Sequence, residues 1–174
     1  SPGLTSSCRL SNIRCYLQIA GVTLTEVISF EQVERAEGRK FPGGKYSIQH
    51  WENFLLTACT GADVMQDGVV HPIALFHVPI LGSGTTIAEM FALGRADSDM
   101  SISIESYDWQ LFNPLKEDTE YDIQGKITDV TRHNHKSEDT APVYDRIVFD
   151  FEVHDDHSLV ASSTVIWHYR REPI

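Results

Sequence analysis

The last 75 residues of the chain alternate between apolar and polar side chains. The alternation runs through four stretches, which are residues 100–112, 120–133, 144–155 and 159–171. Successive side chains of a strand point to opposite faces of a sheet, so a period of two predicts four half-buried strands. Because short connections separate the stretches, we expect an antiparallel meander. One face of this sheet is rich in Ile, Val, Phe and Trp and needs a cover.

Helical signals occupy the first half of the chain. Residues 30–37 are predicted to form a short helix, with Ser29 and Gln32 as its start signal and Gly38 as its stop. Residues 49–61 predict a second helix that ends in a glycine. Four apolar side chains of this second helix fall on one face at helical spacing: Trp51, Phe54, Leu55 and Ala58.

Residues 72–93 form the most apolar helical segment. Pro72 suits the first position of a helix, whereas Pro79 would kink or end it. The following "GSGTT" opens a second short helical stretch. We expect this segment to be buried, which gives an α+β fold with an antiparallel sheet wrapped around a central apolar helix. A length of 174 residues suits one domain, and we expect a lead-in over 1–29 and a single domain over 30–174.

Charge and cysteine content narrow the possible partners and compartments. The net charge of −11 argues against nucleic acid as the main partner. No apolar run approaches the roughly 18 residues of a membrane span, and "SPGLTSSC" lacks the basic and apolar regions of a secretory signal. Cys8, Cys15 and Cys59 include no Cys-x-x-Cys pair, which suits free thiols in a reducing compartment. We therefore expect a cytoplasmic protein that binds no membrane.

Three segments of the sequence resemble the MaoC-like hotdog proteins, over roughly residues 30–172. They are "YDWQLFNPLKEDTEYDIQGKITDV", "GRKFPGGKYSIQHWENFLLTACTGA" and "VVHPIALFHV". The family includes R-specific 2-enoyl-CoA hydratases and 3-hydroxyacyl-thioester dehydratases, whose hotdog units work in pairs. Its catalytic units carry an Asp-x-Asn-Pro-x-His motif before the central helix, where backbone N–H groups polarise the thioester carbonyl. The resemblance therefore implies a hotdog fold and an acyl-CoA or acyl-carrier-protein thioester as substrate.

The family's catalytic motif is not intact in this chain. "VMQDGVVHP" follows Asp63, and the nearest histidine is His71, eight residues later. Such a gap is typical of the family's N-terminal, non-catalytic units, which shape the acyl pocket while a partner hotdog chain carries the catalytic Asp and His. Asp63 and His71 are this chain's own catalytic candidates. The structural alternative is a turn carboxylate and a histidine at a helix entry.

Further residues are candidates for substrate binding, and each has a structural alternative. They are His77, Gly82, Ser83, Gly84 and Trp109. The histidine lies in an apolar run and would otherwise be a core residue, "GSGTT" is either an oxyanion nest or a helix-breaking loop, and the tryptophan either lines an acyl tunnel or belongs to the core. No cofactor is expected. No metal is expected either, because His133 and His135 share a strand face without an evident third ligand.

Eight of the basic residues fall into three groups: Arg35, Arg39, Lys40 and Lys45; Arg132 and Lys136; and Arg170 and Arg171. A positive patch in an acidic chain could receive the phosphates of a carrier such as coenzyme A, or it could be a solvated face.

The sequence supports a hotdog subunit of an enoyl-CoA hydratase or 3-hydroxyacyl-thioester dehydratase. The long strands with free edges predict pairing with a second hotdog chain, as a homo- or heterodimer or a dimer of dimers. One alternative is a hotdog thioesterase, for which Glu89 is the only acidic residue within 72–93. Another is a non-enzymatic protein that binds acyl groups or assists assembly.

Overall fold

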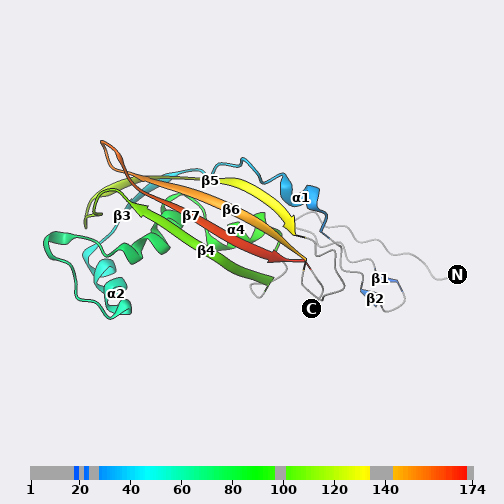
Figure 1. Ribbon diagram of the computed structural model, residues 1–174, viewed down its shortest axis with the longest axis horizontal. Helices are drawn as coiled ribbons and strands as arrows, with labels where there is room; N and C mark the ends of the chain where they lie inside the picture. The colour runs from blue at the N-terminus through cyan, green and yellow to red at the C-terminus, as the bar shows by residue number, and fades with distance from the viewer. Residues whose placement is uncertain (1–17, 20–21, 24–27, 97–100, 134–142, 172–174) are drawn as a thin grey trace.

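A five-stranded antiparallel sheet runs along the longest dimension of the molecule (Figure 1). The computed structural model describes residues 18–19, 22–23, 28–96, 101–133 and 143–171. The strands of the sheet are β3 (Gly44–Ser47), β4 (Ile102–Leu111), β5 (Glu120–His133), β6 (Tyr144–His154) and β7 (Leu159–Arg170). Two short strands near the N-terminus, β1 (Gln18–Ile19) and β2 (Val22–Thr23), pair with each other.

The four long strands confirm the prediction from alternation, but the expected meander is only partly right. The strand order is β3-β5-β6-β7-β4, so β4 pairs with β7 instead of β5. The connection from β4 to β5 crosses the end of the sheet, where backbone hydrogen bonds fasten it: Val70 N–H to Leu115 O, Glu117 N–H to Gly68 O, and Asp118 N–H to Ile48 O. The connection is therefore a crossover that is held by hydrogen bonds and leads from the β4 edge of the sheet to β5, near the opposite edge; it is not a hairpin turn.

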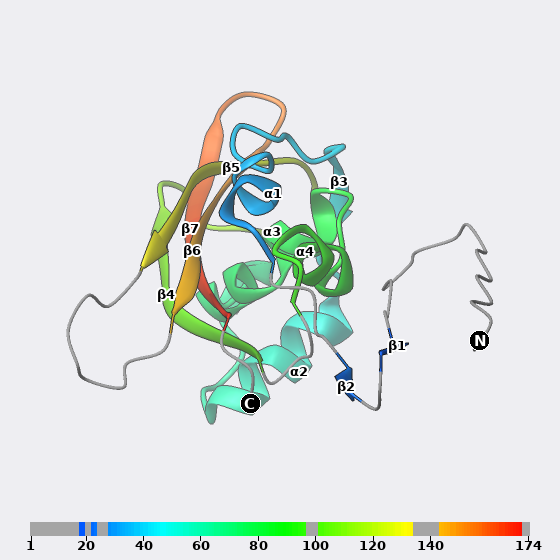
Figure 2. The ribbon, with the colours of Figure 1, turned by 90° about the vertical axis from the view of Figure 1, so that its right-hand side faces the viewer.

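The helices lie on one side of the curved sheet, and the strands wrap around α3 and α4 (Figure 2). The α-helices are α1 (Phe30–Glu34), α2 (His50–Thr60), α3 (Val78–Gly82) and α4 (Ile87–Leu93), and the 3-10 helices are η1 (Gln66–Gly68) and η2 (Pro72–Phe76). Figure 1 places α1 and α2 at opposite ends of the sheet. None of the helices within the described residues is long and apolar enough to cross a membrane. The α+β architecture is therefore as expected.

The expected central helix over 72–93 is present as three short helices, η2, α3 and α4. Pro72 opens η2, as predicted. Pro79 lies in the first turn of α3 and has no N–H to extend a helix from η2, which separates the two. Between α3 and α4 the chain bends through Gly84, whose φ of 73° suits glycine. A continuous helix is thus excluded at two points, although the segment still lies under the sheet.

The predicted start of the first helix at Ser29 and the predicted stop of the second at Gly61 are confirmed, but α1 ends at Glu34, before the expected stop at Gly38. Ser29 caps α1, and its reciprocal hydrogen bonds with Gln32 form a capping box. Gly61 ends α2 in the left-handed conformation, with φ of 74°.

The core consists of two apolar clusters that cover the inner face of the sheet. Side chains along β6 and β7 alternate between buried and partly exposed, as the period of two requires. One cluster surrounds Phe149 and Trp167 and includes Ile80 from α3, and the other surrounds Ile123 and includes Val78. The short helix α3 therefore contributes to both clusters. The proposed boundary between a lead-in and a domain at residue 30 stays a prediction.

A buried carboxylate joins the ends of three strands to their neighbours. Asp145 of β6 has no exposed surface, and it accepts hydrogen bonds from Arg132 Nε at 2.6 Å and Nη2 at 2.9 Å. Arg171, after β7, also donates to this carboxylate. The two guanidinium groups continue to backbone oxygens, Arg132 to Ile28 and Arg171 to Gly94 and Arg95. One anion thus ties the segment before α1 and the segment after α4 to the sheet.

We expect Asp145→Asn to lower the free energy of unfolding by about 3 kcal/mol, because it leaves two largely buried guanidinium groups without a counter-charge. Urea unfolding followed by circular dichroism measures the change. Glu120→Gln is the matched control, because its pair with Lys45 is more than half exposed and such pairs contribute less than about 1 kcal/mol. Equal losses for the two variants would contradict the role of the buried anion.

On the outer face of the sheet, Glu105 of β4 binds Arg146 of β6 and His168 of β7. Its carboxylate accepts from Arg146 Nε at 2.7 Å and lies 2.6 Å from His168 Nε2. The Arg146 hydrogen bond, with a smaller contribution from His168, lowers the pKa of Glu105 from 4.5 to about 2. This group links the edge strand β4 to β7 and β6.

We expect the stabilising effect of Glu105 to disappear in acid. A folded-state pKa below the unfolded value means that the ionised group stabilises the fold above about pH 4.5, and that this is lost as the pH falls towards about 2. The difference in unfolding free energy between the wild type and Glu105→Gln should therefore shrink over this range. Denaturant unfolding at several pH values measures it, and a difference that stays constant with pH would refute the expectation.

Candidate functional site

The helix α2 turns its polar side towards the body of the protein and its apolar side outwards. Glu52, Asn53 and Thr57 are buried. The apolar face predicted from the sequence exists, but Trp51, Phe54, Leu55 and Ala58 lie on the exposed surface. The helical spacing correctly predicted that these four apolar residues share one face. It did not predict that the opposite, polar face is the buried one. Its signal was present as Asn53 and Thr57, which are themselves four residues apart.

Asn53 is the hydrogen-bonding centre of this buried face. Its Nδ2 donates to Val69 O at 3.2 Å and to Glu117 Oε1 at 2.7 Å. Its Oδ1 accepts from the N–H of His71 at 3.1 Å and from the hydroxyl of Thr57 at 3.3 Å. One side chain therefore holds both the loop that follows α2 and the connection between β4 and β5. Hydrogen bonds from Asn53 and, secondarily, His50 lower the pKa of Glu117.

Glu52 connects α2 to β3 and to the start of α3. Its Oε1 accepts from the hydroxyl of Tyr46 at 2.8 Å and lies 3.1 Å from His77 Nε2. Burial, reinforced by the hydrogen bond to Glu52, raises the pKa of Tyr46 to about 12, so this tyrosine stays a neutral donor. Of these three residues only His77 was a candidate from the sequence, because Glu52 and Tyr46 reach it from other elements.

The contact with Glu52 fixes the orientation of the His77 ring. A carboxylate can only accept a hydrogen bond, so Nε2 is the donor in this contact, and in the neutral ring Nδ1 is then the acceptor. The side chain of His77 is 29% exposed. A histidine oriented by a carboxylate through one nitrogen can accept a proton or bind a donor through the other. This is the chemistry that the pair of Glu52 and His77 can perform.

No hydrogen bond or ion pair joins Asp63 to His71. Asp63 is exposed in the segment after α2, and no hydrogen bond or ion pair joins it to another described residue. His71 caps η2, and its ring Nδ1 accepts the N–H of Ile73 at 3.1 Å. The segment between them is irregular apart from the single turn of η1. A catalytic role for either residue stays a prediction.

The glycines of the "GSG" bend pack closely against β3 and β5. A Cβ at Gly82 would clash with Ile123, and a Cβ at Gly84 would lie 2.9 Å from Gly43 O. Ser83 is fully buried, and its hydroxyl donates to Ile80 O at 3.0 Å. Close packing explains Gly82 and Ser83 in this place, whereas Gly84 also borders a surface hollow.

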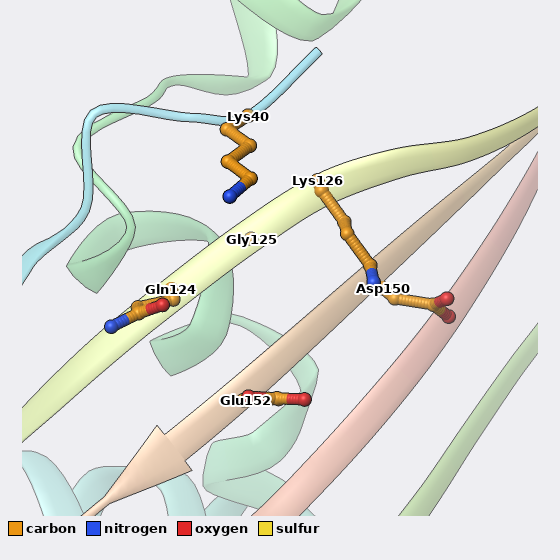
Figure 3. A pocket seen from close by; sticks show the side chains of 6 residues that line it. All are labelled: Lys40, Gln124, Gly125, Lys126, Asp150 and Glu152. Atoms are coloured by element: carbon orange, nitrogen blue, oxygen red, sulfur yellow. The ribbon is translucent and has the colours of Figure 1, made fainter. Parts of the chain in front are cut away.

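Three hollows border Lys40, which precedes β3. One has a volume of about 320 Å³, with Arg39, Gly84 and Thr85 among its lining residues. A second, of about 380 Å³, reaches Gly44 and Asp122. The third, of about 150 Å³, lies over β5 and β6 (Figure 3), and its lining residues are Lys40, Gln124, Gly125, Lys126, Asp150 and Glu152.

The basic side chains beside these hollows lack ion-pair partners among the described residues, whereas the carboxylate of Glu89 is already hydrogen-bonded. Arg39 and Lys40 make no ion pair with any residue of the described ranges. By contrast, Glu89 accepts from the hydroxyl of Thr85 at 3.2 Å and from the N–H of Thr86 at 2.9 Å. Two cations are thus left available for an external anion.

Three other residues of these basic groups already have acidic partners. Lys45 forms an ion pair with Glu120, and Arg132 and Arg171 bind Asp145. Lys136 lies outside the described residues.

Trp109 lies on β4, an edge strand whose outer side has no partner strand among the described residues. Its side chain is 36% exposed, so it is not a core residue. Within the part of the chain that is described, no group of three or more His, Cys, Asp or Glu side chains could hold a metal ion. His135 lies outside that part.

Models of known protein families give no match to this sequence, and neither do curated proteins. Solved structures do resemble the fold. The ChsH1-ChsH2 complex from Mycobacterium tuberculosis gives a TM-score of 0.59 at 10% identity, over 83% of this chain and 90% of that chain. The C-terminally truncated HadBC (3R-hydroxyacyl-ACP dehydratase) complex from the same organism gives 0.55 at 13% identity, over 76% and 96%. A predicted thioesterase from Bacillus stearothermophilus gives 0.52 at 12%, over 78% and 88%.

These similarities concern the fold, because the sequences share so few residues. Together with the five-stranded sheet curved around α3 and α4, they show that the chain has the hotdog fold. Proteins with this fold include dehydratase subunits and thioesterases.

We expect Asn53→Ala to lower the free energy of unfolding by about 3 kcal/mol, because it leaves several buried polar groups without partners. The amide of His71 should exchange with deuterium at least about tenfold faster, since it loses its acceptor. Hydrogen exchange followed by mass spectrometry measures this. Asn113→Ala is the control, because Asn113 is exposed. Unchanged exchange at residues 69–71 would show that Asn53 does not hold the loop.

Proposed function

We propose that the chain is a hotdog subunit of an acyl-thioester hydratase or dehydratase. It would bind an acyl-CoA or acyl-carrier-protein thioester where it meets a second hotdog chain. The observation that carries the proposal is the combination of a hotdog sheet with an Asp63 and a His71 that no hydrogen bond joins. A subunit with this fold and without an assembled acid–base pair is suited to shaping a binding site that a partner completes.

Catalytic Asp and His groups would come from the partner chain. Addition of water to an enoyl thioester needs a base near neutral pH and a donor to the carbonyl oxygen. In this chain His71 uses Nδ1 to cap η2, and Asp63 stands in solvent without a partner among the described residues. Neither residue is held against the other, so the pair is not preorganised for proton transfer.

This chain would contribute groups that bind the substrate. His77 has its Nδ1 available for a polar group of the acyl part, because Glu52 holds the opposite nitrogen. Arg39 and Lys40 would attract the phosphates of the carrier, beside the backbone of Gly84. Gly82 and Ser83, which pack against β5 and α3, would hold the bend that contains Gly84 in position.

The partner would add to the sheet along β4. This edge strand is ten residues long, and exposed apolar side chains follow it at Ile104, Trp109 and Leu111. A long edge with free backbone groups readily accepts another strand. Pairing there would cover Trp109 and bring a second chain to the side of the molecule that carries Phe76, which stacks on Tyr107 of β4.

Thioester hydrolysis is a second candidate function, which the position of Glu52 favours. The acidic residue expected for this reaction from the sequence was Glu89, but its carboxylate caps α4. Glu52 instead reaches the start of α3 from α2 and orients His77. A carboxylate and a histidine in contact can activate water for hydrolysis. A non-enzymatic acyl-binding protein is the third possibility.

The isolated chain should not hydrate crotonyl-CoA, because it lacks a joined Asp63 and His71. Loss of the enoyl absorbance measures hydration, and release of free thiol measures hydrolysis. Turnover that is lost in Asp63→Ala or His71→Ala would refute partner-supplied catalysis and make these residues catalytic. Hydrolysis that is lost in Glu52→Gln would establish the second candidate function instead.

Binding of crotonyl-CoA by the chain should weaken by about tenfold when Arg39 and Lys40 are both replaced by Glu, a change of about 1.4 kcal/mol. Isothermal titration calorimetry measures the affinity. Lys45→Glu is the matched control, because Lys45 belongs to the same basic stretch but its ammonium group already pairs with Glu120. An equal loss in the control would mean that overall charge, not this hollow, governs binding.

A further inference from the structure

The exposed side of α2 is apolar and carries no acidic or basic residue from Trp51 to Thr60. Trp51, Phe54 and Leu55 are 64%, 51% and 53% exposed. The acidic residue of this stretch, Glu52, is buried on the opposite side. In a chain with 25 acidic and 14 basic residues, such an uncharged surface is unusual. Depletion of charge and enrichment in aromatic residues are typical of the centre of a protein–protein interface.

The helix cannot turn this surface inwards. Glu52 is bound to Tyr46 and His77, and Asn53 is bound to Val69 and His71. Rotating α2 to bury its apolar side would break these hydrogen bonds and expose their partners. The apolar stripe, defined here as Trp51, Phe54, Leu55 and Ala58, is therefore fixed in an outward position and available for a contact between molecules.

We propose that the apolar stripe of α2 binds the same stripe on a second copy of this chain. Its members recur at the i, i+3, i+4 and i+7 spacing of a helix–helix seam. A two-fold interface places one patch against itself, so a charged patch would repel its copy whereas this neutral one does not. The contact goes beyond the proposed function, because it joins copies of this chain and does not involve the β4 edge.

The size of the stripe suits the centre of such an interface. With side-chain areas of about 150–250 Å², the exposed fractions of Trp51, Phe54 and Leu55 leave about 250–420 Å² exposed per copy. A standard interface buries about 800 Å² per partner, of which an apolar centre and a polar rim each form a part. The neighbouring polar surface of α2, at His50 and Thr60, can supply the rim.

The net charge of −11 on each copy opposes the association through long-range repulsion. Added salt screens this repulsion and leaves contacts between apolar side chains intact. Self-association through the stripe should therefore strengthen as salt increases. An interface built on ion pairs would weaken under the same conditions.

The test is the molar mass of the purified full chain by sedimentation velocity, at several salt concentrations. Phe54→Ser combined with Leu55→Ser should halve the mass found for the wild type. Leu81→Ser, on α3, removes a side chain that is equally exposed at 50% and should leave the mass unchanged. Both positions are on the surface, and far-ultraviolet circular dichroism checks that the variants fold.

Three results would overturn the proposal. They are a wild type with the mass of a single chain at about 100 µM and high salt, a double variant that keeps the wild-type mass, and an association that weakens as salt is added. The measurement does not depend on thioester binding, so a failure here leaves the proposed function standing. Conversely, a chain that associates through the apolar stripe but does not bind the thioester would contradict the proposed function and leave this inference standing.

Discussion

The buried amide of Asn53 is the interaction on which the functional end of the molecule depends. Its donors and acceptor satisfy groups from the loop after α2 and from the connection between β4 and β5. Buried polar groups need such partners, because leaving them unpaired is costly. This requirement determines which side of α2 faces the body. It also holds the start of η2 in place and, through the adjacent Glu52, positions His77.

The polar attachment of α2 explains why its apolar residues lie outside. In most surface helices the apolar stripe faces the core and gives most of the stability. Here hydrogen bonds, together with the packing of Leu56 on the second apolar cluster, attach the helix, and the apolar stripe stays free for contacts with another molecule. The same arrangement brings a carboxylate, a phenol and an imidazole together under the helix. The outward apolar face and the inward polar face of α2 thus underlie both the proposed contact between copies and the pairing of Glu52 with His77.

Local patterns in the sequence predicted the elements well, whereas contacts between distant residues decided the rest. The alternation in β6 and β7 was reliable because burial follows it residue by residue. The position of β4 beside β7 was not predictable, since period two does not specify a partner strand. The pair of Glu52 and His77 was missed because 25 residues separate them. "GSG" suggested a binding nest, which stays a prediction, and the close approach of Ile123 and Gly43 to its glycines could not be read from the local pattern.

The position of β4 at the far edge of the sheet affects the order in which the chain can fold during synthesis. β4 emerges from the ribosome before β5, β6 and β7, yet its partner β7 is the last strand of this sheet to be made. Until then, Ile104, Trp109 and their neighbours have no strand to pair with and are exposed to other chains. A growing chain with such an unpaired apolar strand is prone to aggregate and is a natural client for chaperones. The non-local pairing that completes the sheet therefore makes its last step slow.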